Sequence, residues 1–259
     1  MTLRPVEGTL PLTERCHHYE DINEVHLDLA KYWHQRYSIF NFYDYDIRMT
    51  DDAWFGVTPE PVATKIAKDL RSHNYSTPRK DTIIDLFAGA GGNTIAFALS
   101  EKWDRVIAIE KDASTLACAQ HNAAVYGVAD AITWVHANSL DFLARLKIPG
   151  AGKGKGKGKA LELDPSLWVD FSRTVLFASP PWGGVNYRGQ DVFDLSTMEP
   201  YNLETLHEAC RPMEHALYLP RTSDLRQIAE LVPDGTKIDV VQYCMEGASK
   251  AMVAYMPAE

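Results

Sequence analysis

The chain has 259 residues, of which 46% are hydrophobic, and carries a formal net charge of −9. These values allow one catalytic domain with a modest extension, and the charge argues against broad, sequence-independent RNA binding, which needs a basic face. They leave room for recognition of one small cationic RNA end. Four cysteines (Cys16, Cys118, Cys210 and Cys244) lack metal-ligand spacing, so we expect reduced intracellular thiols and no metal site. No apolar run has signal-peptide or transmembrane length, so we expect no membrane association.

The first 57 residues are predicted to form a helical N-terminal extension. Residues 1–16 are polar and irregular, whereas apolar residues between Asp21 and Ile39 recur at helical spacing. A further helix is predicted to begin near Pro59, with Thr58 as its N-cap and the proline at its first position. We therefore expect an extension at 1–57 and a catalytic domain at 58–259.

Seven apolar runs predict the strands of one sheet, at 82–87, 106–110, 132–136, 174–179, 215–220, 237–243 and 250–256. Helical stretches separate most of them, which predicts an α/β doubly wound sheet. A short segment joins the last two runs and predicts an antiparallel hairpin at one edge. The Gly/Lys alternation at about 150–160 cannot pack a core and predicts a flexible insertion. A solvated loop is favoured there over a basic arm that contacts RNA phosphates.

The first strand leads into a glycine-rich loop, Asp85-Leu86-Phe87-Ala88-Gly89-Ala90-Gly91-Gly92-Asn93, and then into a helical pattern. This arrangement binds nucleotide-like ligands. The second strand ends in Glu110, whose carboxylate suits two ribose hydroxyls. The loop lacks the G-x-G-x-x-G spacing that holds a pyrophosphate, and Asp85 suits an amino group. These details favour S-adenosylmethionine over a nicotinamide cofactor.

A second motif, Ser179-Pro180-Pro181-Trp182-Gly183-Gly184, follows the fourth strand. Its two prolines forbid continuation as a helix or central strand, so the chain turns rigidly there. The turn presents a hydroxyl, a free carbonyl and an indole at the end of a strand. Such a group suits one task, the gripping of a flat ring that carries an amino group.

Together these motifs resemble the trimethylguanosine synthase family of RNA cap hypermethylases. The resemblance runs from about Lys31 to Tyr255, through KYWHQRY, WFGVTPE, DLFAGAGGNTIAFAL, VIAIEKD, HNAAVYGVAD, SPPWGG and YLPR. It implies a class I methyltransferase, with a Rossmann-like seven-stranded sheet and a helical N-terminal segment. It also implies transfer of two methyl groups from S-adenosylmethionine to N2 of a 7-methylguanosine cap.

The resemblance implies a set of cofactor-binding residues. In the family an aspartate at the end of the third strand faces the adenine amine; here Asn138 occupies that place, and its amide oxygen can still accept. Thr58 matches a family position near the cofactor, with a simple helix cap as an equal alternative. The full expected set is Asp85, Phe87, Gly89, Gly91, Asn93 and Thr94 in the loop, with Glu110, Asn138 and Thr58 around it.

The reacting centre is expected at Ser179, Pro180 and Trp182. Ser179 and the Pro180 carbonyl would hold N2, and Trp182 would stack on the charged 7-methylguanine ring, a cation–π contact worth up to about 2 kcal/mol. Lys31 and Arg221 match basic family positions and are expected to bind cap phosphates. Lys31 would thereby make the extension part of the substrate site. No general base is apparent.

Substrates and partners are implied by the resemblance alone. They are capped small nuclear and small nucleolar RNAs and the core proteins of small nuclear ribonucleoproteins. A monomer is expected in the nucleus or nucleolus, with the cytoplasm as a further location. Three alternatives stay open. They are an amino-methyltransferase for another RNA base or a protein amide, a nicotinamide oxidoreductase, and a catalytically silent cap-binding module.

Overall fold

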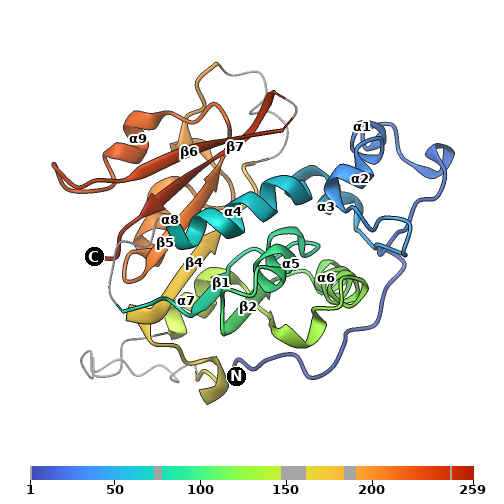
Figure 1. Cartoon of the computed structure of the whole chain (residues 1–259), viewed down its shortest axis with the longest axis horizontal. Coiled ribbons are helices and arrows are strands. Elements are labelled where there is room, and N and C mark those ends of the chain that lie inside the picture. Colours follow the sequence, from blue (N-terminus) through green and yellow to red (C-terminus); the bar gives the residue numbers. More distant parts are fainter. Residues whose placement is uncertain (1, 73–77, 147–161, 184–190, 246) are drawn as a thin grey trace.

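Seven strands form one mixed sheet in the order β3-β2-β1-β4-β5-β7-β6 (Figure 1). A computed structural model of the protein describes residues 2–72, 78–146, 162–183, 191–245 and 247–259. The predicted Gly/Lys insertion lies outside these residues. None of the helices described is long and apolar enough to cross a membrane.

The strands confirm all seven predicted runs, with ends within two residues of those expected. Strands β1 to β5 are mutually parallel, and β7 lies antiparallel between β5 and β6. The predicted edge hairpin is therefore present. The strand bounds are β1 Thr82–Asp85, β2 Arg105–Glu110, β3 Ile132–His136, β4 Thr174–Ala178, β5 Glu214–Leu219, β6 Asp239–Met245 and β7 Ala248–Met256.

Helices cover both faces of the sheet. Successive strand residues point to opposite faces, so Ile83 packs in one hydrophobic cluster and Ile84 in the other. The first cluster is closed by α4 (Glu60–Ser72), α5 (Gly92–Leu99) and α6 (Ala113–Val125), which lie in front of the sheet in Figure 1. The second is closed by α7 (Ser139–Arg145), α8 (Leu203–Cys210) and α9 (Leu225–Ala229).

The extension consists of short helices rather than one long one. They are a 3₁₀ turn at Ile22–Glu24, α1 (Ala30–Trp33), α2 (Arg36–Ile39) and α3 (Asp51–Gly56). The continuous helical pattern expected between residues 21 and 39 is thus broken. In a straight helix Trp33 and Ile39 would project about 120° apart, on different faces. The breaks allow both to be buried in the cluster that also contains α4.

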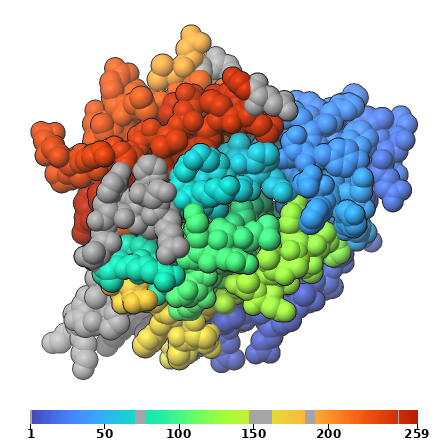
Figure 2. Space-filling view, viewed as in Figure 1, coloured from blue at the N-terminus to red at the C-terminus, as the bar shows by residue number. Residues whose placement is uncertain are grey.

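Residues 2–20, called the strap below, run from the edge of β3 along α6. The amide of Val6 donates to the carbonyl of Trp134 at 2.8 Å, and Leu10 N donates to Gln120 Oε1 at 2.8 Å. In Figure 2 the surface of the extension continues without a break into that of the catalytic domain. All four cysteines are free thiols, as expected.

Candidate active site

A cavity of about 400 Å³ lies at the carboxyl ends of β1 to β4. The strand order reverses between β1 and β4, and ligands of doubly wound sheets bind at this switch point. The volume falls in the range of small-molecule sites. Eight residues predicted from sequence are among those that line it: Thr58, Phe87, Gly89, Asn93, Glu110, Asn138, Ser179 and Pro180.

The glycine loop is shaped by a positive φ at Gly91 and a close backbone approach at Gly92. Gly91 has a φ of +98°, which disfavours any side chain. A Cβ on Gly92 would lie 3.2 Å from the Thr58 carbonyl oxygen, so the loop and the start of α4 pack backbone against backbone. Gly89 also has a positive φ, but its Cβ position faces open space. The backbone at Gly89 therefore borders the open space of the cavity.

Asp85 lies beneath the cavity rather than in its wall. Its side chain is fully buried, and it accepts from Thr94 Oγ1 at 2.6 Å and from the Phe87 amide at 3.2 Å. Burial raises the pKa of this carboxyl to about 6. The sequence predicts direct contact with an amino group. In this structure both oxygens of Asp85 instead hold the glycine loop and the first turn of α5.

Glu110 lines the cavity and is oriented by three backbone amides. Oε1 accepts from Lys111 N at 2.8 Å and Asp112 N at 2.9 Å, and Oε2 accepts from Gly89 N at 3.0 Å. Burial raises the pKa of this carboxyl, although the three hydrogen bonds from backbone amides act to lower it. A carboxylate offers about four lone-pair sites, so one remains on Oε2 for a further donor.

Thr58 and Asn93 form a buried pair at the cavity wall. Asn93 Nδ2 donates to Thr58 Oγ1 at 2.9 Å, while Asn93 Oδ1 is buried with no partner among the described residues. The N-cap role predicted for Thr58 is wrong. Helix α4 begins at Glu60, and the Pro59 carbonyl accepts its first amide bonds, from Val62 and Ala63.

The reacting motif follows β4 directly. Ser179 and Pro180 line the cavity, and Pro180 is buried. Trp182 is half-buried outside the described cavity wall. Its indole stacks on Tyr218 of β5, with ring centres 5.7 Å apart and planes at 17°, and its Nε1 donates to the Tyr218 carbonyl at 3.3 Å. These two contacts with Tyr218 orient the indole.

The two predicted phosphate-binding residues do not line the described cavity. Lys31 is exposed on α1, with its Nζ 4.9 Å from the centre of the Tyr32 ring. Arg221 is exposed in the turn after β5, where Ser223 Oγ donates a hydrogen bond to the Pro220 carbonyl. Gly91 and Thr94, which support the glycine loop, are likewise absent from the described lining.

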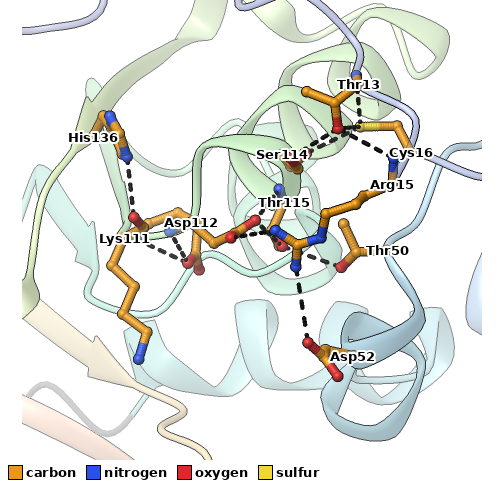
Figure 3. Close-up of polar contacts among 11 residues, drawn as sticks. Thr13, Arg15, Cys16, Thr50, Asp52, Lys111, Asp112, Ser114, Thr115 and His136 are labelled. Atoms are coloured by element: carbon orange, nitrogen blue, oxygen red, sulfur yellow. Dashed lines mark hydrogen bonds and ion pairs between the residues drawn. The ribbon is translucent and has the colours of Figure 1, made fainter.

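Sequence reasoning missed a group of charged residues at the cavity rim. Figure 3 shows Arg15 reaching from the strap to Asp112 Oδ2 at 2.8 Å and to Asp52 Oδ2 at 3.8 Å. All three side chains line the cavity. Beside them, Thr13 Oγ1 and Ser114 Oγ lie 2.8 Å apart. The residues come from three distant segments, so no local motif could have grouped them.

Comparisons with known proteins show the family to which the chain belongs. Residues 80–259 match the family model described as RNA cap guanine-N2 methyltransferase. The chain belongs to this family. It is 34% identical to a trimethylguanosine synthase of Schizosaccharomyces pombe over 230 residues, which cover 88% of this chain and 85% of that protein. It is 32% identical to a trimethylguanosine synthase of Saccharomyces cerevisiae over 210 residues, 78% of this chain and 57% of that protein.

Two solved structures support the fold. A putative methyltransferase from Porphyromonas gingivalis W83 aligns with a TM-score of 0.52 and 12% identity over 87% of this chain and 47% of its own. This chain thus spans about half of that structure. The human methyltransferase 10 domain containing protein aligns with a TM-score of 0.50 and 14% identity, over 89% and 98% of the two chains. The predicted class I methyltransferase fold is confirmed.

The family membership establishes the reaction in outline. The enzyme uses S-adenosylmethionine and hypermethylates RNA caps at guanine N2, so capped RNA is its substrate. The nicotinamide alternative is wrong. The cavity fits this cofactor on its own evidence. The unpartnered Asn93 Oδ1 suits an ammonium, the remaining lone pair of Glu110 suits a ribose hydroxyl, and the space beside Gly89 suits the chain that joins them.

Proposed function

We propose that the enzyme methylates N2 of a 7-methylguanosine cap twice in succession, giving a 2,2,7-trimethylguanosine cap. One observation carries the proposal. Ser179 and Pro180 open into the cavity that the glycine loop and Glu110 also line, with the fixed indole of Trp182 two residues further on. A ring stacked on that indole would present its edge to the hydroxyl and carbonyl of the motif.

The reaction requires positioning more than acid–base chemistry. S-adenosylmethionine supplies a methyl group on a sulfonium, which is already strongly electrophilic. The exocyclic amine is a poor nucleophile because its lone pair is delocalised into the ring. Acceptors at Ser179 Oγ and the Pro180 carbonyl would draw its N–H bonds out of that plane. As the N–C bond forms and the C–S bond breaks, S-adenosylhomocysteine would leave and N2 would release one proton to solvent. Holding two reactants in line accounts for much of the rate in such reactions.

The second round places a steric demand on the site, because N2 then already carries a methyl group. Ser179 is small, and its neighbour Pro180 is buried and rigid. The turn therefore keeps its shape while leaving room beside the hydroxyl. We propose that this combination permits the second transfer.

The cap charge provides the proposed selectivity. A 7-methylguanine ring is cationic, and an indole attracts a cation more strongly than the other aromatic rings do. Trp182 would therefore favour a methylated cap over plain guanine. Lys31 on the extension and Arg221 after β5 would neutralise the phosphates that follow the base. The extension, 1–57, would thus complete the substrate site of the catalytic domain, 58–259.

The cellular setting is proposed from the family resemblance. The RNAs are small nuclear and small nucleolar RNAs, and core proteins of their ribonucleoproteins are the expected partners. We propose that the enzyme acts as a monomer in the nucleus or nucleolus and also in the cytoplasm.

The decisive experiment compares two small substrates. The protein is incubated with labelled S-adenosylmethionine and either 7-methyl-GDP or GDP, and the products are analysed by mass spectrometry. Mono- and then dimethylated N2 products should form from 7-methyl-GDP and almost none from GDP. Equal methylation of both would refute the role of ring charge. Methylation of neither, with the cofactor bound, would point to another RNA base, a protein amide or a silent cap-binding module.

A further inference from the structure

The cavity contains a hydrogen-bonded pair, Asn138 and Tyr201, that no sequence motif predicts. Asn138 Nδ2 donates to the Tyr201 hydroxyl at 2.6 Å. Asn138 follows β3 and Tyr201 directly precedes α8, and both residues line the cavity. The pair therefore joins the segment after β3 to the segment before α8 in the wall of the cavity that Ser179 also lines.

The amide of Asn138 is fixed in one orientation. It is the N-cap of α7, and its Oδ1 accepts from Leu140 N at 3.0 Å and Asp141 N at 3.2 Å. A carbonyl oxygen has two lone pairs, so both are occupied. A flipped amide would set its N–H groups against two backbone N–H groups. The sequence predicts that this oxygen accepts a hydrogen bond from the adenine amine. That contact would require the loss of one of the two hydrogen bonds that cap α7.

The Tyr201 hydroxyl, unlike the Asn138 amide oxygen, can accept a further hydrogen bond. A phenol has two acceptor lone pairs and one proton, and Asn138 occupies one lone pair. The ring is held by Phe87, at 6.3 Å between centres, and by Asn202, which caps α8 through Thr205 N at 2.9 Å. No other described residue bonds to this hydroxyl, so one lone pair and one proton remain for a ligand.

We propose that the Tyr201 hydroxyl selects the purine of the cofactor by accepting a hydrogen bond from the 6-amino group of adenine. Asn138 acts as a positioning residue, because its Nδ2 orients the phenol and its Oδ1 anchors α7. The adenine amine is therefore recognised by Tyr201, which precedes α8, rather than by Asn138, which follows β3.

Calorimetry with two ligands tests this assignment. S-adenosylhomocysteine is compared with its 6-deamino analogue, in which hydrogen replaces the amino group, on the whole chain and its Tyr201→Phe variant. Loss of one neutral hydrogen bond should weaken S-adenosylhomocysteine binding about fivefold to tenfold. The analogue should bind both proteins within about twofold, because it has no amine to lose. Equal weakening for both ligands would show a merely structural tyrosine, and an unchanged affinity would remove Tyr201 from the site.

Two further variants sharpen the result. Tyr45→Phe alters a tyrosine that is 72% exposed, and it should change neither affinity. Asn138→Asp in the Tyr201→Phe background keeps an oxygen for the helix cap and adds a second acceptor. It should restore S-adenosylhomocysteine binding to within about twofold of the starting protein, with thermal unfolding as the check on folding. An unrestored affinity in a folded double variant would contradict the placement of this pair at the amine.

Discussion

Replacement of Trp182 by alanine is expected to abolish most cap methylation while leaving cofactor affinity unchanged. The indole is fixed by Tyr218, through a 5.7 Å stacked contact and a 3.3 Å hydrogen bond, and it does not line the described cavity wall. Stacking of a base on an aromatic ring contributes about 1–3 kcal/mol. This corresponds to a rise of about 5- to 150-fold in KM for 7-methyl-GDP, and the ring charge adds to it.

A loss of kcat should accompany the rise in KM, because an unstacked ring no longer presents N2 in line with the methyl group. Trp182→Phe should recover part of the activity, since stacking survives with a weaker ring quadrupole. Trp168→Ala is the matched control, because that indole is 59% exposed and is absent from the described cavity wall. Steady-state kinetics with calorimetry of S-adenosylhomocysteine measure both effects. Unchanged KM and kcat in a folded Trp182→Ala protein would refute the stacking role.

Three other predictions concern the cofactor site, the extension and the core. Glu110→Gln should weaken S-adenosylmethionine binding by about 1.5–3 kcal/mol in calorimetry, the range for a hydrogen bond to a charged group; an unchanged Kd would remove the residue from the site. Lys31→Ala should mainly raise KM for the capped substrate, and full activity after removal of residues 1–57 would show that the sheet domain suffices. Burial lowers the pKa of His215 to about 4, so the unfolded chain takes up a proton first as the pH falls below 6.5. The free energy of unfolding should therefore fall by roughly 3 kcal/mol between pH 6.5 and 4; a His215→Asn variant with the same pH slope in urea titrations would contradict this.

The local chemistry of the chain was sufficient to predict the sheet and the position of the cofactor loop. Alternating or continuous apolar runs mark the strands, because each strand must bury one or both faces. The glycines and Glu110 are close in sequence to the strand ends that carry them. Their meeting at one edge follows from the parallel order of β1 and β2. The motif after β4 predicted Ser179 and Pro180 as site residues, and the observed pairing of β4 with β1 brings them to the cavity.

The strands, the glycine loop and the motif after β4 could thus be recognised from the residues alone, because they depend on contacts between near neighbours. The hydrogen-bond partners of the polar side chains, in contrast, depend on how the folded elements pack together. In the folded chain Asp85 accepts a hydrogen bond from Thr94, and the Asn138 oxygen caps α7. Folding also brought in Tyr201, 63 residues from Asn138, and Arg15, 97 residues from Asp112. These pairings depend on how whole elements pack, and no local period or spacing encodes that packing.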